Sequence, residues 1–176
     1  MTWMEIRDAM KAGKDTVIVA TGGLEQNGPY LVSAKHNIVL RATTEALARK
    51  LGNALVSSII QFVPEGDIDP PTGHMKYPGT IGLTAATFEA LLTDVASSLK
   101  TNGFKTIVFI GDSGGNQAGM KKVAEALSGK WAAAGAPARV YFIPEYYQYP
   151  ALHEWIETSL GIRQVDEGLH DDYAIS

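Results

Sequence analysis

The stretch IVFIGDSGGN, residues 107–116, passes from a short apolar run into a glycine-rich turn. The apolar run is of the kind that fills buried strands, and the glycines favour a tight turn that opens a helix. Two chemistries suit this turn. Its letters fit the G-x-S-x-G elbow, in which Ser113 would be a nucleophile above an α/β sheet. Its position fits the loop at the carboxyl end of a parallel strand, where open α/β sheets gather ligand-binding groups.

Apolar spacing along the rest of the chain predicts alternating strands and helices. Strands are expected at 16–20, 55–63, 106–110 and 139–143, and helices at 38–51, 84–100, around 120–131 and at 151–160. Asn37 and Thr84 stand where helix N-caps are expected. Repeated strand–helix–strand units predict one α/β domain over residues 1–176, with a three-layer α/β/α architecture and a mainly parallel central sheet.

Composition excludes several classes of function. The net charge is −4 with 19% charged residues, whereas nucleic-acid and anionic-membrane surfaces need clustered basic side chains. The chain has no cysteine, so any metal ion would be held by His, Asp and Glu. No apolar run approaches the roughly 18–20 residues of a membrane span. We therefore expect no nucleic-acid or membrane partner. A cytoplasmic location is expected, or a periplasmic or secreted one if a leader has been removed.

Four loop segments collect the residues that carry chemistry: 22–36, 65–80, 111–116 and 166–172. Three of the four histidines lie in them, namely His36, His74 and His170. Because loops at the carboxyl ends of parallel strands converge, these segments are expected to form one site. The alternative is that His and Asp favour loops simply as turn formers and solvated residues. Tyr146, Tyr147, Tyr149 and Trp155 form an aromatic cluster that would line a pocket, an interface or a small satellite core.

The serine-elbow interpretation also needs an acid and a histidine later in the chain, and Asp166 and His170 stand in that order. An oxyanion hole would have to come from Gly22 and Gly23. The simpler alternative is that the backbone N–H groups of residues 114–116 approach a ligand or cap the helix.

Four blocks, in order, resemble the creatininase family. TGGLEQNGPYL (21–31) is similar to its Gly-x-x-Glu-Gln-His-Gly-Pro-His-Leu-Pro signature, and GHMKYPGTI (73–81) to its His-x-x-Phe-Pro-Gly-Thr segment. Residues 111–116 fall where the family has Asn-Gly-His-Gly-Gly-Asn, and 168–170 resemble the block with its late catalytic histidine. The resemblance implies a metal-dependent amidohydrolase that acts on the C–N bond of a small amide or cyclic amide, often as a hexamer.

The family's metal-ligand pattern is altered in this chain. Glu25 keeps the first ligand, but Asn27 stands at a ligand-histidine position and His36 at that of the bridging aspartate. Ser113 replaces another histidine. Either the ligand set has been rebuilt around a single ion, with Asp112 and one of Asp171 or Asp172, or metal binding has been lost. The chain also stops inside the late motif, so we expect a domain truncated at its C-terminus.

These arguments predict a small-molecule hydrolase with a divalent ion, Zn²⁺ or Mn²⁺, that forms a homo-oligomer, with a hexamer among the expected forms. The alternatives are a non-catalytic ligand-binding or assembly subunit of the same fold, and a serine hydrolase that uses Ser113. The predicted site residues are His170, Asp171 and Ser113 for catalysis; Gly114, Gly115, Asn116, His74 and Tyr30 for substrate binding; and Glu25, His36, Asp112 and Asp172 for the metal.

Overall fold

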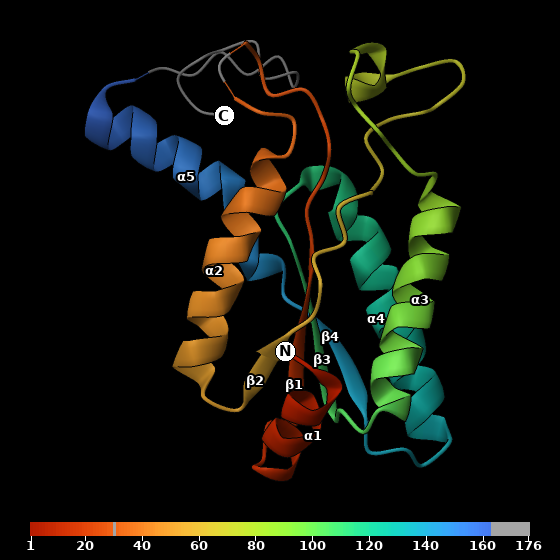
Figure 1. Ribbon diagram of the computed structural model, residues 1–176. Coiled ribbons are helices and arrows are strands. Elements are labelled where there is room, and N and C mark those ends of the chain that lie inside the picture. The colour runs from red at the N-terminus through yellow and green to blue at the C-terminus, as the bar shows by residue number, and fades with distance from the viewer. Residues whose placement is uncertain (30, 163–176) are drawn as a thin grey trace.

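A computed structural model of the chain describes residues 1–29 and 31–162, and its centre is a parallel β-sheet (Figure 1). The four strands lie in the order β2-β1-β3-β4, and each pairs with its neighbours in parallel. Their bounds are β1 Thr16–Thr21, β2 Ala54–Val56, β3 Thr106–Gly111 and β4 Arg139–Phe142. The predicted α/β class with a mainly parallel sheet is confirmed.

Helices cover both faces of the sheet and complete three layers (Figure 1). Their bounds are α1 Trp3–Lys11, α2 Lys35–Leu51, α3 Ala85–Thr101, α4 Gln117–Ala133 and α5 Tyr149–Trp155, followed by a π-helical turn at Ile156–Leu160. Short 3-10 turns occupy Gly73–Lys76, Gly114–Asn116 and Pro144–Tyr146. Among the described helices none is long and apolar enough to cross a membrane.

Side chains of β1 alternate between two hydrophobic cores. Val17 and Val19 join the core under α3 and α4, which also holds the fully buried Phe88 and Phe109. Ile18 and Ala20 face the core under α2. A strand that is buried on both faces needs apolar residues at every position, which explains why TVIVAT has no polar alternation. Each fully buried large side chain contributes about 2 kcal/mol of transfer free energy.

The connections place a crevice at the carboxyl ends of β1 and β3. These two strands are paired from Thr16↔Thr106 to Thr21↔Gly111. The chain leaves β1 toward α2 on one face of the sheet and leaves β3 toward α4 on the other. Adjacent strands whose connections diverge in this way form a topological switch point, where open α/β sheets bind ligands.

The structure differs from the sequence prediction in three elements. The second strand is regular only at Ala54–Val56; beyond it, single bridges join Ile60 to Thr21 and Val63 to Gly82. Asn37 is not a helix cap, because α2 already begins at Lys35 and the Asn37 side chain bonds to Gly23 instead. Helix α1 was not predicted at all, although Thr2 and Glu5 form a capping box that signals its start.

Candidate functional site

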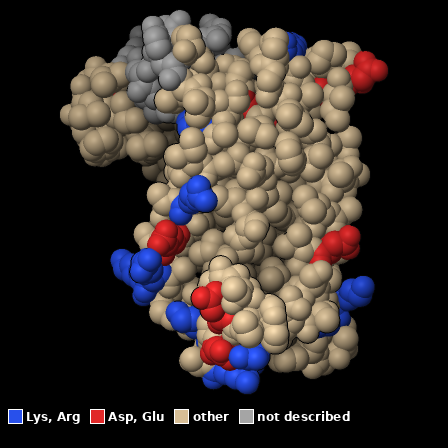
Figure 2. Space-filling view, viewed as in Figure 1, with Lys and Arg blue, Asp and Glu red and all other residues tan. Residues whose placement is uncertain are grey.

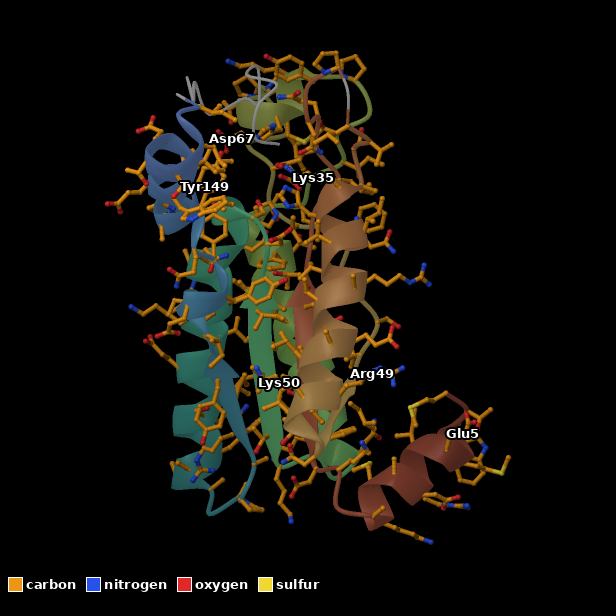
Figure 3. The ribbon with its side chains drawn as sticks, turned by 90° about the vertical axis from the view of Figure 1, so that its left-hand side faces the viewer. Glu5, Lys35, Arg49, Lys50, Asp67 and Tyr149 are labelled. Atoms are coloured by element: carbon orange, nitrogen blue, oxygen red, sulfur yellow. The ribbon has the colours of Figure 1, made fainter. Side chains whose placement is uncertain are left out.

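A pocket of about 450 Å³ opens at this switch point, a volume in the range of small-ligand sites. Three of the four predicted loops meet there, and Tyr147 and Tyr149 close one side. The chemically active side chains that line it are Glu25, Lys35, His36, Glu65, His74, Asp112 and Ser113. Figure 3 shows Lys35 on α2 and Tyr149 on α5 at the same end of the sheet. The structure thus brings the predicted Glu25, His36 and Asp112 together.

His36 lies between two carboxylates. Its Nε2 is 2.7 Å from Oε1 of Glu25, and its Nδ1 is 3.1 Å from Oδ2 of Asp112. A carboxylate oxygen accepts hydrogen bonds, so each ring nitrogen is placed to donate, and the two contacts together favour the imidazolium form. Burial by itself lowers the pKa of His36, but the hydrogen bonds to Asp112 and Glu25 outweigh it and raise that pKa above its usual value.

Lys35 adds a second positive charge to the pocket. Burial lowers the pKa of its ammonium group, whereas the charges of Glu25 and Asp112 act in the opposite direction. The two cations therefore face the same two carboxylates. Neither the spacing nor the family resemblance had singled out Lys35, because a lysine at a helix start is usually solvated.

Glu65 forms a carboxyl pair with Glu25. Its side chain is hydrogen-bonded to Glu25 and to the backbone N–H of Leu24. Burial, together with the hydrogen bond and the charge of Glu25, raises the pKa of Glu65 to about 10. Glu65 therefore carries the proton of the pair at neutral pH. Nε2 of His74 lies 3.5 Å from Oε2 of Glu25, so Glu25 is the centre of the polar network.

Two glycines after β1 allow α2 to begin close to this network. The Asn37 amide accepts a hydrogen bond from the Gly23 N–H and donates one to the Gly23 carbonyl. A Cβ on Gly22 would lie 2.0 Å from Oδ1 of Asn37, and one on Gly23 would lie 2.4 Å from Oε1 of Glu65. The Gly22–Gly23 pair is therefore needed for close packing around the site, and it fixes the start of α2, where Lys35 and His36 stand.

The remaining predicted residues divide between the pocket and its support. Gly114 and Gly115 line the pocket, as does His74. Asn116 is fully buried, and its amide donates to the Thr21 and Gly22 carbonyls at 3.2 and 2.8 Å. It ties the loop after β3 to the end of β1 and does not reach the pocket lining. Tyr30, His170, Asp171 and Asp172 lie outside the described residues.

The elbow interpretation of Ser113 is not supported by the local geometry. The nucleophile of such an elbow sits on a strained turn. Ser113 instead has φ −134° and ψ 145°, an ordinary extended conformation. His36 gives both of its ring nitrogens to carboxylates and neither to Ser113. The serine lines the pocket, and Asp166 and His170, the acid and base of that interpretation, lie outside the described residues.

The side chains that the structure describes, which do not include Asp172, do not form a site for a divalent metal ion. Within residues 1–29 and 31–162, no group of three His, Asp or Glu side chains has an arrangement that could hold a metal ion, although Glu25, His36 and Asp112 lie close together. A histidine ligand must offer an unprotonated nitrogen, and both nitrogens of His36 already donate to carboxylates. Asn27 turns its amide to the carbonyls of Glu25 and Val32, at 3.0 and 3.2 Å. Three predicted ligands, Glu25, His36 and Asp112, therefore lie together, but their polar atoms are hydrogen-bonded to one another.

Comparison with known proteins places this pocket in a family context. Residues 1–170 match the creatininase family, described as creatinine amidohydrolase. A curated relative, creatinine amidohydrolase of Pseudomonas putida, is 26% identical over 110 residues, which cover 62% of this chain and 42% of the relative. A solved structure described as creatininase Mn superposes with a TM-score of 0.73 at 22% identity, covering 90% of this chain and 61% of its own. A second solved structure, described as a mutant creatininase of Zn-Zn type, superposes with a TM-score of 0.75 at 19% identity. The match covers 94% of this chain and 63% of that structure.

These relatives are longer than the chain described here. The chain spans 42% of the curated relative and 61% and 63% of the two structures. At these identities the structural likeness establishes the three-layer fold, in agreement with the parallel sheet described above.

Proposed function

Because the chain belongs to the creatininase family, we propose that it hydrolyses a C–N bond of a small amide or cyclic amide. The observation that supports this most is that Glu65, which holds a proton at neutral pH, pairs with Glu25 in the same pocket as the two carboxylates that flank His36. Amide hydrolysis needs a proton acceptor for water and a proton donor for the leaving nitrogen. Titratable groups whose pKa values are pushed apart supply such a pair.

Each charged side chain has a role in this proposal. Asp112 is the more open of the two carboxylates bonded to His36, with 25% of its side chain exposed against 3% for Glu25. Asp112 accepts a proton from water as the water oxygen attacks the amide carbon. Lys35 faces the negative charge that develops on the carbonyl oxygen. As the C–N bond breaks, Glu65 donates its proton to the nitrogen, and exchange with solvent restores both carboxyl groups.

The family resemblance implies a divalent ion, and the two structural relatives are described as Mn and Zn-Zn forms. In the sequence prediction the ion would be held by Glu25, His36, Asp112 and Asp172, and it would polarise the carbonyl. The described donors do not fit that ion, so every step above is assigned to side chains.

The test is a panel of small amides, lactams and other cyclic amides, with release of amine or amino acid as the signal. Asp112→Asn should lower turnover at least about 100-fold, because an amide cannot accept the proton. Glu125→Asn, an exposed change on α4, serves as a control and should leave turnover within about twofold. Unchanged turnover in folded Asp112→Asn would contradict the proposed role.

A non-catalytic binding subunit of the same fold is the second candidate. It is favoured by the network around His36, in which both ring nitrogens of His36 face carboxylates and neither is left to act as a base. Saturable binding of a panel compound at the pocket, with no product after prolonged incubation, would select this candidate.

We also propose that the chain forms a homo-oligomer through the side of α2 and β2. A hollow of about 1090 Å³ runs there, larger than the pocket at the switch point, and Arg41, Glu45 and Arg49 line it together with apolar side chains. Ile38 and Val56 line it and are 59% and 36% exposed. In Figure 2 basic and acidic side chains lie at the left, over α2, whereas the middle of the view beside it is mostly uncharged. Apolar faces of this kind are commonly buried between subunits.

A further inference from the structure

We infer that the imidazolium of His36 occupies the place of a metal cation, and that this pocket works with an internal positive charge and no divalent ion. The inference concerns the proposed site, but it does not depend on which bond the site cleaves. It rests on where the hydrogen bonds of the described residues go and on the balance of charge.

First, both ring nitrogens of His36 are engaged by carboxylates. Nε2 and Nδ1 lie 2.7 and 3.1 Å from oxygens of Glu25 and Asp112, so both nitrogens face carboxylates, and neither is turned toward an open part of the pocket. A metal ligand needs a nitrogen lone pair and an unprotonated ring. To bind an ion, His36 would have to lose a proton and give up one of its two carboxylates. The same carboxylates are the side chains that a metal would need.

The second step is that the ring is held in place. Lys35 and His36 are the first two residues of α2, and Asn37 after them bonds to both backbone groups of Gly23. The His36 side chain is only 8% exposed. The Asn37 hydrogen bonds hold the backbone that carries His36, and burial leaves its ring little room to turn away from Glu25.

The third step is the charge. Two basic side chains, His36 and Lys35, face the same two acidic ones, Glu25 and Asp112, and burial beside Glu25 raises the pKa of Glu65 so that it holds its proton. The pocket therefore pairs its acidic side chains with basic side chains of its own. A divalent ion would bring two further positive charges beside His36 and Lys35, which is costly in a poorly solvated site.

The experiment is metal titration of the full chain by calorimetry and elemental analysis, with Mn²⁺ and with Zn²⁺. Wild-type protein purified without chelator should hold less than about a tenth of an equivalent and take up none in the pocket. His36→Asp removes the internal cation and adds a carboxylate, so it should bind about one equivalent at least tenfold more tightly than wild type. The matched control is His153→Asp on α5, which lies outside the pocket lining and should gain no such site.

Two results would overturn the inference. One is uptake of about an equivalent of Mn²⁺ or Zn²⁺ by wild type that Glu25→Gln abolishes, because that ion would sit in the pocket. Uptake that survives Glu25→Gln lies elsewhere and supports the inference. The other is a folded His36→Asp that binds no more metal than wild type, because His36 would then not be what excludes the ion.

A measurement on wild type decides the question if His36→Asp does not fold. Nitrogen-15 NMR of histidine-labelled protein should show both ring nitrogens of His36 protonated, with signals unchanged by an equivalent of Zn²⁺. An unprotonated nitrogen, or a His36 signal that moves with Zn²⁺ and not in Glu25→Gln, would refute the inference. These readouts do not need turnover, so a failure to find a substrate leaves them intact.

Discussion

At the scale of single residues, Glu65 is a described side chain whose pKa the fold raises far above its ordinary value. It is 5% exposed, and its Oε1 has no hydrogen-bond partner among the described residues. Its carboxyl pairs with that of Glu25, and its pKa is raised to about 10 from 4.5. A folded-state pKa above the unfolded one makes a contribution to stability that is complete below pH 4.5 and is lost as the pH rises toward 10.

Glu65→Gln should therefore stabilise the protein at neutral and alkaline pH, because glutamine mimics the protonated carboxyl and does not titrate. The gain in unfolding free energy should be near zero below pH 4.5 and should grow with pH. At pH 7 it should be on the order of 2 kcal/mol. Urea denaturation at several pH values measures it. Glu125→Gln, which is exposed on α4, is the control, and a pH-independent difference for Glu65→Gln would contradict the assignment.

Part of this network could be predicted from the sequence and part could not. Glu25, His36 and Asp112 are ligand-type residues in loops that a parallel sheet brings together, so their proximity followed from the topology. Their arrangement did not, because it depends on which way the His36 ring points from the start of α2. The raised pKa of Glu65 could not be predicted from the sequence either. It depends on a carboxyl pair with Glu25, which lies 40 positions away and meets Glu65 only in the folded, buried site.

At the scale of elements, the joint between the loop after β1 and the start of α2 decides the shape of the site. Gly22 packs against Asn37, and there is no room for a side chain between them. The sequence signal for this joint was misassigned, because asparagine ahead of an apolar-periodic segment is the usual mark of a helix cap. In the structure the Asn37 side chain forms hydrogen bonds with Gly23 and does not cap the helix.

Gly22→Ala should destabilise the protein by about 1–3 kcal/mol, because its Cβ would lie 2.0 Å from Oδ1 of Asn37 and would break that side chain's bonds to Gly23. Gly129→Ala is the matched control. Gly129 lies inside α4 with no atom near its Cβ position, so the change should stabilise by about 0.5–1 kcal/mol. Thermal and urea unfolding compare the two. Equal effects of both changes would contradict the packing argument.

The regular elements were predicted best where the apolar pattern was long. Thr84 caps α3 as expected and accepts a hydrogen bond from the Thr87 N–H at 3.2 Å. The strand expected at 55–63 was overestimated, because β2 lies at the edge of the sheet and makes only a three-residue ladder before the chain turns along the end of β1. Apolar composition alone cannot separate an edge strand from an extended segment.

At the scale of the whole molecule, the side of α2 and β2 is proposed to be a subunit contact. Val56→Lys should shift the molar mass measured by light scattering toward that of a monomer, because a charge placed in an apolar interface is desolvated without a partner. Leu91→Lys on α3 is the control, since Leu91 is also exposed, at 37%, but lies on the opposite face. A monomeric wild type, or an oligomer that Val56→Lys leaves intact, would remove this proposal.

The central claim is that the pocket carries its own cation and hydrolyses an amide with side chains alone. The most direct measurement is metal content and turnover on one preparation, after exhaustive chelation and removal of the chelator. The account predicts that turnover of the best panel substrate persists with less than about a tenth of an equivalent of metal, and that added Mn²⁺ or Zn²⁺ does not raise it. Turnover that disappears on chelation and returns with one equivalent of either ion would contradict it.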